Sequence, residues 1–262
     1  MTDFERAVDI LTKGDRHRVW SLIVTVFGDL AQNLGDEISA QTLGKLTEPL
    51  GVKSEALRVA LHRLRKEGWL ESRRTGRSST YFLAPYGQSQ TASATPRIYC
   101  QTSPTERNWT LLSASGSSAD SVQDLAAAEN DGKVVRLSNA SFLTGEPGAL
   151  ALNDVLKTGI DQSDVPEWVK QAVLKDAVCD SYAKLSGSFS EVLDCLNGKE
   201  RAIERAALRT LIVHSWRRIR LRHLDVPAAF HPIDCKAEDC KERYLSLLSK
   251  LPKPSLNEIG DL

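Results

Sequence analysis

The residues with the clearest chemical potential are the cations between Lys53 and Arg77. This stretch holds eight Lys and Arg residues against three acids, a local charge of +5 in a chain whose formal net charge is zero. Lysine and arginine neutralise phosphates, and arginine also donates paired hydrogen bonds to guanine. The chemistry indicated here is therefore binding to nucleic acid.

The first half of this stretch predicts a helix with one buried and one exposed face. Ser54 is expected to cap it, because its hydroxyl can accept a hydrogen bond from the first turn, and Gly68 to end it in the left-handed conformation. Apolar residues recur at the spacing of one helix face, namely Leu57, Ala60, Leu61 and Leu64. The other side carries Arg58, His62 and Arg65, with Glu55 and Lys66 beside them. In many proteins such a stripe is only a solvated face, so the helix alone is weak support for DNA binding.

The second half predicts a β-hairpin with a basic tip. Residues 69–74 and 78–83 form its arms, and Thr75-Gly76-Arg77 is the short loop between them. Arg73, Arg74 and Arg77 gather at this tip. A basic helix followed by a basic hairpin is the order of parts in a winged helix-turn-helix, in which the helix enters the major groove and the wing lies along phosphates.

The residues before the basic helix supply the other helices that such a module needs. One helix is predicted from Asp15 to about Ala31 and another from Ser39 to Leu50, each with apolar residues on one face. Gly51 then begins the turn that leads into the basic helix. Three helices and a hairpin thus fit within residues 15–83.

The rest of the chain is predicted to form two further domains, so that the boundaries fall at 1–90, 91–165 and 166–262. Residues 84–96 are rich in Ser, Thr, Gly and Pro and are expected to be a linker, although their middle could form a helical turn or two. Strands at 109–115 and 133–142 enclose a helix at 118–128 that Ser118 is expected to cap, which indicates a small α/β unit. From Pro166 onward the pattern is helical, with helices expected near 180–196, 199–224 and 237–251.

Composition excludes several classes of protein. The apolar share is 41% and the charged share 26%, both ordinary for a soluble globular protein. No apolar run approaches the roughly 20 residues that span a bilayer, and the N-terminus lacks a signal-peptide pattern. Five cysteines at irregular spacing favour a reduced, cytoplasmic protein over a disulfide framework.

The sequence gives little support for a metal site or for a catalytic site. His214, His231, Cys235 and Cys240 could be drawn as a zinc site, but their spacing matches no common zinc pattern. Cys235 with a histidine could be drawn as a thiol nucleophile, but nothing in the sequence positions a base or oxyanion donors. No metal, cofactor or catalytic residue is therefore predicted.

A second basic group lies near the C-terminus. It consists of Arg217, Arg218, Arg220 and Arg222, with His214 one turn earlier. A solvated face with internal ion pairs is the simpler interpretation. The alternative is that His214, Arg217, Arg218 and Arg220 clamp the phosphates of a CoA-like effector, since guanidinium groups pair well with phosphate.

Three blocks of the sequence together resemble the PaaX family of transcriptional repressors. The first block, residues 51–83, carries the family's pattern on Arg58, Ala60, Arg63, Leu64, Gly68, Trp69, Leu70, Gly76, Arg77, Ser79 and Tyr81. The second block is Arg97-Ile98-Tyr99 followed by Trp109-Thr110, and it is similar to the beginning of the family's middle domain. The third block, residues 207–232, is similar to the family's C-terminal helix with paired arginines and to the Leu/Pro-rich loop after it.

The resemblance implies both a fold and a function. The fold would be α+β, with an N-terminal winged helix-turn-helix, a small ferredoxin-like (Cas2-like) α/β middle domain and a helical C-terminal domain for dimerisation and effector response. The function would be that of a homodimeric repressor of a phenylacetate-type catabolic operon. It would bind a palindromic operator in double-stranded DNA and be released by phenylacetyl-CoA or a related acyl-CoA.

The predicted DNA contacts divide by their place in the module. Base edges are expected to meet the first half of the basic helix, at Ser54, Glu55, Arg58 and His62. Phosphates are expected to meet Arg63, Arg65, Lys66, Arg73, Arg74 and Arg77. The resemblance adds Ser79 and Tyr81 of the hairpin to the DNA-binding residues.

Two functions of other classes remain open. One is an enzyme, an acyl-CoA hydrolase or a nuclease-like protein, with an accessory DNA-binding head. The strand at 109–115 contains no acid that could hold a catalytic metal, which argues against the nuclease. The other is a structural nucleic-acid-binding protein without an effector, which ligand-dependent release from a defined operator would distinguish from a repressor.

Overall fold

The protein is a mixture of helices and antiparallel strands, as expected for an α+β fold. The computed structural model describes residues 1–13, 18–76, 78–101, 104, 107–115, 119–150 and 152–260. Asp15 and Ser118, predicted as helix caps, and Arg77 of the predicted wing lie outside these residues. The described strands form one sheet of three strands and one of four.

The chain divides into two compact units. The first comprises residues 1–99, 185–218 and 239–262, and the second comprises residues 100–184 and 219–238. Two long helices, α8 (Asp176–Cys195) and α9 (Ala202–Arg220), each have residues in both units. The three-part division at residues 90 and 165 stays a prediction.

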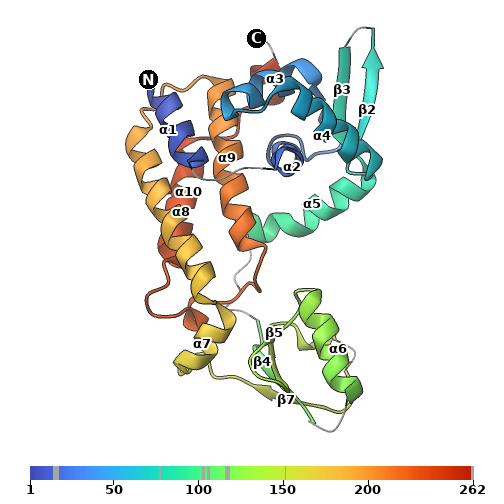
Figure 1. Ribbon diagram of the computed structural model, residues 1–262, viewed down its shortest axis with the longest axis vertical. Helices are drawn as coiled ribbons and strands as arrows, with labels where there is room; N and C mark the ends of the chain where they lie inside the picture. Colours follow the sequence, from blue (N-terminus) through green and yellow to red (C-terminus); the bar gives the residue numbers. More distant parts are fainter. Residues whose placement is uncertain are drawn as a thin grey trace. The chain divides into compact units, whose positions relative to one another are not determined.

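The N-terminal part of the first unit is built from four α-helices. They are α1 (Asp3–Thr12), α2 (Val19–Leu30), α3 (Ala40–Thr47), which continues as the 3₁₀ turn η1 (Glu48–Leu50), and α4 (Ser54–Lys66) (Figure 1). Ser39 begins α3 as predicted, because its hydroxyl accepts a hydrogen bond from the Thr42 N–H. Gly51, at φ +77°, turns the chain into α4. Leucines of α3 and α4 belong to the same buried cluster as Phe27 of α2, so these helices share one core.

A hairpin follows α4. Its strands are β2 (Leu70–Thr75) and β3 (Ser78–Leu83), and the short β1 (Ile38–Ser39) completes a sheet of order β1-β3-β2. Leu70 pairs with Leu83 and Thr75 with Ser78, so two residues rather than the predicted three separate the paired arms. Leu70 and Leu83 are buried in the core of the N-terminal helices, which anchors the base of the hairpin.

The linker predicted at residues 84–96 is wrong, because residues 85–96 belong to helix α5 (Pro85–Ile98) and Ala84 is its N-cap residue. Pro85 occupies the first turn, where its missing N–H costs nothing. A Cβ at Gly87 would lie 2.2 Å from the carbonyl oxygen of Trp69, so glycine permits the close approach of α5 to the end of α4. Packing of this kind overrides the weak helix propensity of the segment.

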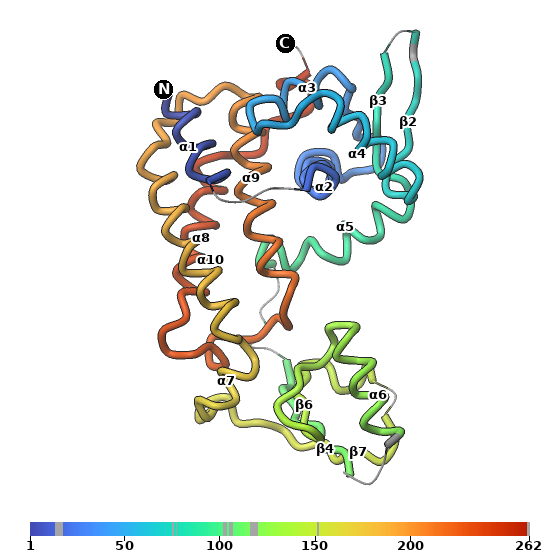
Figure 2. The backbone as a smooth tube through the Cα atoms, in the orientation of Figure 1, coloured from blue at the N-terminus to red at the C-terminus, as the bar shows by residue number. Residues whose placement is uncertain are grey.

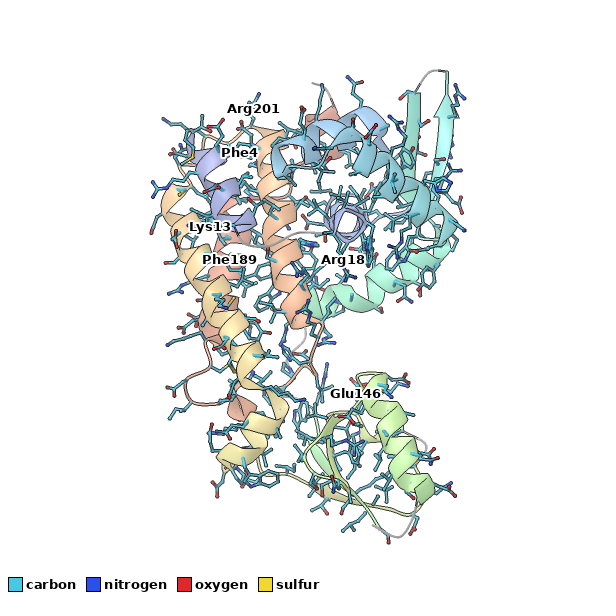
Figure 3. The ribbon with its side chains drawn as sticks, in the orientation of Figure 1. Phe4, Lys13, Arg18, Glu146, Phe189 and Arg201 are labelled. Carbon is cyan, nitrogen blue, oxygen red and sulfur yellow. A yellow bond between two sulfur atoms is a disulfide. The ribbon has the colours of Figure 1, made fainter. Side chains whose placement is uncertain are left out.

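C-terminal helices complete the first unit. Here α10 (Ala237–Lys250) runs alongside α8 and α9, and the unpredicted short helix α11 (Leu256–Gly260) follows it (Figure 2). Phe189 of α8, labelled in Figure 3, is fully buried. Its ring stacks on that of Tyr244 of α10, which stacks in turn on Trp216 of α9. Ile203 of α9 and Ile259 of α11 join the core of the N-terminal helices.

The second unit holds the four-stranded sheet. Its elements are β4 (Thr110–Ala114), α6 (Ala119–Asn130), β5 (Val135–Arg136), β6 (Ser141–Thr144), η3 (Pro147–Ala149) and β7 (Val155–Gly159), and the sheet order is β5-β6-β4-β7. Phe142 on one face packs with residues of α6. Leu143 on the other face packs with α7 (Glu167–Val173) and η4 (Ala228–Phe230).

Two predictions for the second unit are wrong. The single strand expected at 133–142 is a tight pair, β5 and β6, because the N–H groups of Leu137 and Ser138 both turn back to the carbonyl of Ser141. The preference for reduced cysteines also fails for one pair, since Cys179 and Cys235 form a disulfide with their Cα atoms 5.0 Å apart. That pairing joins residues 56 positions apart, which cysteine spacing alone does not reveal.

Across the residues that the structure describes, no helix is both long and apolar enough to cross a membrane.

Candidate nucleic-acid interface

Helix α4 begins without a side-chain cap and ends in a backbone hydrogen-bond motif. Lys53 is its N-cap residue and makes no side-chain capping bond, so the prediction that Ser54 caps the helix is wrong; Ser54 is instead its first, exposed residue. At the other end Gly68 has φ +75°, and the Trp69 N–H donates to the Leu64 carbonyl at 2.9 Å. With the bond from the Gly68 N–H to the Arg65 carbonyl, this is a Schellman ending.

The two faces of α4 separate as the sequence predicts. Leu57, Ala60, Leu61 and Leu64 are buried against the core. The predicted DNA-binding residues of the helix are all exposed: Ser54, Glu55, Arg58, His62, Arg63, Arg65 and Lys66. The outward face of α4, meaning Glu55, Arg58, Val59, His62, Arg65 and Lys66, is therefore open to a ligand. Val59 is the member that sequence reasoning missed, although it stands four residues after Glu55 in the polar stripe.

Arg63 differs from the other cations of α4 because it has two protein partners. Its guanidinium lies 5.0 Å from the centre of the Trp20 ring on α2. Its Nε donates to Glu67 across 2.7 Å. These contacts hold Arg63 at the side of the helix that faces α2.

The strand register places the two hairpin arginines on opposite faces. Arg73 is paired with Thr80, and Arg74 with Ser79, the half-buried neighbour of Thr80. Successive side chains of a strand point to opposite faces. Arg73 and Arg74 therefore cannot both lie on one face of the β2–β3 hairpin.

Arg73 and Thr80 share one acidic partner. Arg73 donates to Glu37 across 2.7 Å, and the Thr80 hydroxyl donates to the other carboxylate oxygen of Glu37, also at 2.7 Å. The exposed Arg74 instead donates to the carbonyl of Gly76 at 3.2 Å. Tyr81, a predicted DNA contact, packs against the core of the N-terminal helices.

A row of polar contacts connects α2 with α9. The Arg217 guanidinium donates to the Ser21 hydroxyl at 2.8 Å, and Thr25 Oγ1 lies 3.0 Å from His214 Nδ1. The third contact joins Asp29 and Arg209. Because positions 21, 25 and 29 are four residues apart, they lie along one side of α2. Sequence reasoning missed these α2 residues.

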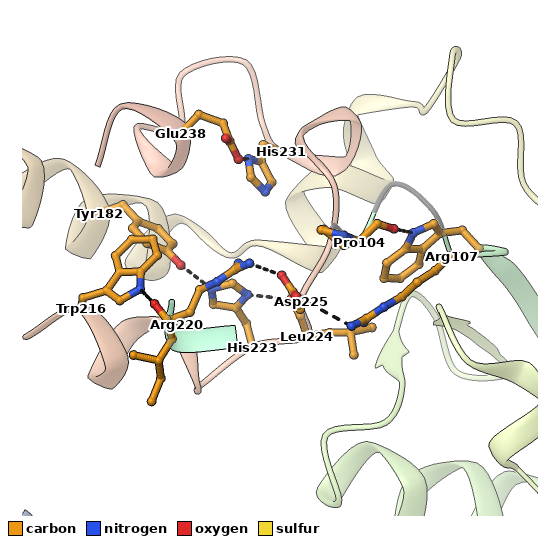
Figure 4. Close-up of polar contacts among 12 residues, drawn as sticks. Pro104, Arg107, Tyr182, Trp216, Arg220, His223, Leu224, Asp225, His231 and Glu238 are labelled. Carbon is orange, nitrogen blue, oxygen red and sulfur yellow. Dashed lines mark hydrogen bonds and ion pairs between the residues drawn. The ribbon is translucent and has the colours of Figure 1, made fainter. Parts of the chain in front are cut away.

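The four predicted effector residues are divided between the two units, with His214, Arg217 and Arg218 in the first and Arg220 in the second. His214 and Arg217 contact α2 in the first unit, where burial lowers the pKa of Arg217 to about 10. Arg220 belongs to the second unit and pairs with the buried carboxylate of Asp225, which Arg107 also approaches at 3.8 Å (Figure 4). Arg218 lies in the first unit, half-buried. Effector binding by this set stays a prediction.

No metal centre is evident among the described residues, where no three His, Cys, Asp or Glu side chains gather to hold an ion. Cys235 is joined to Cys179. A bridged sulfur has no thiolate for zinc binding or nucleophilic attack.

A model of a known family matches the part of the chain that contains α4 and the β2–β3 hairpin. Residues 18–87, which span α2 to the beginning of α5, match the family model described as PaaX-like protein. The first of the three sequence blocks, residues 51–83, lies within this match, so the family model confirms the resemblance for that block.

A particular relative extends the match along the chain. The protein is 26% identical to the transcriptional repressor PaaX of Escherichia coli (strain K12), over 92% of this chain and 83% of the relative. Among solved structures, it is similar to the uncharacterized protein Rv0674 from Mycobacterium tuberculosis, at a TM-score of 0.48 and 17% identity. That match covers 85% of this chain and 90% of the other.

Proposed function

We propose that this protein is a DNA-binding transcriptional repressor whose helix α4 enters the major groove and whose β2–β3 hairpin serves as the wing. The observation that carries the proposal is the outward face of α4, where exposed cations surround His62 beside a hairpin with an exposed Arg74. The similarity to the Escherichia coli repressor supports the same function.

The dimensions of α4 suit this role. Its 13 residues make a helix of about 20 Å, and a major groove about 12 Å wide admits one helix. Recognition helices meet base edges mainly with their N-terminal residues. Ser54, Glu55 and Arg58 take this part in the proposal, with His62 one turn further on.

Phosphate contacts are assigned to the flanks and the wing. Arg65, Lys66 and Arg74 are exposed, so their cations can approach a DNA backbone. Arg73 and Arg63 are held by Glu37 and Glu67, so we assign them first to positioning the wing and the helix. Binding dominated by such contacts weakens steeply as salt rises.

Dimerisation and effector release complete the proposal. One module contacts too little DNA for high affinity, so a homodimer on a palindromic operator is expected. The family resemblance supports release by phenylacetyl-CoA or a related acyl-CoA, and a cytoplasmic location follows from action on DNA. The second unit is proposed to be ferredoxin-like, which the order β5-β6-β4-β7 and the helix between β4 and β5 support.

The test begins by selecting bound fragments from the genome of the source organism. The protein should retain a small set that shares a palindromic sequence, and Arg58→Ala should weaken the preference for it. A matched control is Lys157→Ala, which removes an exposed cation from β7. Retention of random fragments by wild type and both variants would contradict sequence-specific repression.

The same fragments test the effector. Phenylacetyl-CoA should release the DNA, whereas phenylacetate and free CoA, added separately as controls, should not. Sequence-specific binding that none of these compounds changes would be consistent with the DNA-binding function and would contradict phenylacetyl-CoA as the effector.

A further inference from the structure

Val59 stands near the centre of the outward face of α4. The buried residues Leu57, Ala60, Leu61 and Leu64 define the inward direction of the helix. At about 100° per residue, Glu55, Val59, His62 and Lys66 all fall within roughly 30° of the opposite direction. The Val59 side chain is 69% exposed, an apolar group between carboxylate, imidazole and ammonium groups.

Neither helix formation nor packing accounts for a valine at this position. Valine is β-branched and loses side-chain freedom in a helix, so alanine would form the helix better. The Val59 side chain belongs to none of the buried clusters of the described residues. Single exposed apolar residues are common on proteins, so the exposure matters here only because of its place between Glu55 and His62.

The major groove offers one apolar group to such a side chain. Each base pair presents hydrogen-bond donors and acceptors there, and thymine alone adds a methyl group, at C5. Val59 is the sixth residue of α4, in the half of a recognition helix that lies closest to base edges. The charges around Val59 disfavour an apolar protein partner, which would have to bury them unpaired.

We propose that Val59 contacts the C5 methyl of a thymine in the operator and so determines sequence preference at that base pair. This inference rests on the proposed DNA-binding function. It assigns to α4 an apolar contact beside the polar contacts of Arg58 and His62.

Deoxyuridine tests the contact, because it differs from thymine only in lacking the C5 methyl. Each thymine of the selected operator is replaced in turn, at symmetric positions in both half-sites, and the Kd is measured. For wild type, one position should weaken binding by about fourfold per half-site, the order expected for one buried carbon group. The same replacement should change the Kd of Val59→Ala by less than about twofold.

Arg58→Ala is the matched control and should keep the full deoxyuridine effect. The thermal unfolding temperature of Val59→Ala should be equal to or higher than that of wild type, because alanine forms helices better than valine.

The outcomes separate the inference from the function. Sequence-specific binding that is insensitive to deoxyuridine at every position, or equally sensitive in wild type and Val59→Ala, overturns the inference alone. Absence of any sequence preference overturns the proposed function, and the inference with it.

Discussion

Arg209 of α9 donates a hydrogen bond to the carboxylate of Asp29 on α2 across 2.8 Å, and both side chains are buried. The Tyr99 hydroxyl donates to the other carboxylate oxygen of Asp29 at 2.5 Å, and Arg209 also donates to the carbonyl of Leu251. Residues 180 positions apart are thus joined inside the first unit. Because α2 packs on α4, this contact connects the C-terminal helices with the helix that supports the proposed DNA-binding face.

Removal of the Asp29 carboxylate should destabilise the protein strongly. Asp29→Ala leaves the Arg209 guanidinium buried without its counter-charge, and breaking one half of a buried pair costs about 3–5 kcal/mol. Chemical denaturation measures this loss. Glu67→Ala is the control, since it breaks the exposed pair with Arg63 and should cost less than about 1 kcal/mol. A similar decrease in the free energy of unfolding in both variants would show that Asp29 does not form a buried ion pair.

Tyr99 should make the protein sensitive to alkali. Burial, followed by the neighbouring charge of Asp29, raises the pKa of Tyr99 above its usual value near 10. The folded protein therefore keeps this proton at pH values where the unfolded chain loses it, so the stabilisation is complete below about pH 10 and declines above it. Between pH 9.5 and 11.5 the free energy of unfolding should fall more steeply for wild type than for Tyr99→Phe. Parallel slopes would contradict the raised pKa.

Two glycine substitutions should have effects of opposite sign. In Gly87→Ala the new methyl would meet the Trp69 carbonyl oxygen, so α5 must shift, at a cost of about 1–3 kcal/mol. In Gly44→Ala the methyl on α3 would meet nothing within 4 Å, and alanine should stabilise the helix by about 0.5–1 kcal/mol. Thermal unfolding of the two variants distinguishes these effects. A tolerated Gly87→Ala would show that α5 does not approach Trp69 closely.

Thiol titration tests the disulfide. Protein unfolded without reductant should react at three thiols, those of Cys100, Cys195 and Cys240, and at five after reduction. In the folded protein Cys240 should be unreactive near neutral pH, because burial raises its pKa to about 12. Reduction should lower the free energy of unfolding by about 2–4 kcal/mol. Five reactive thiols without reductant would contradict the bridge.

The elements of the proposed interface could be predicted because their signals are local. The periodicity from Leu57 to Leu64 and the glycines at 68 and 76 determine a helix and a hairpin within 30 residues. Helix α5 could not be predicted in this way, since its short polar residues become helical through packing at Gly87.

Long-range contacts carry no such local signal. His214 lies 189 residues from its partner Thr25, and the contact depends on which faces of α2 and α9 meet. The disulfide between Cys179 and Cys235 depends likewise on the tertiary fold. The predicted cluster of effector arginines followed from sequence proximity, whereas the fold gives Arg217 and Arg220 different partners.

The salt dependence of DNA binding tests the central claim, that the outward face of α4 and the wing bind a duplex. The affinity for a selected operator and for a random duplex is measured at several salt concentrations for wild type, Arg74→Ala and Arg58→Ala, with Lys157→Ala as control. Arg74→Ala should lower the affinity for both duplexes by the same factor and reduce the slope of log K against log salt by about 1. Arg58→Ala should lower the affinity for the operator more than the affinity for the random duplex. Lys157→Ala should have the same affinities and salt slopes as wild type. Identical affinities and slopes for all four proteins would contradict the proposed interface.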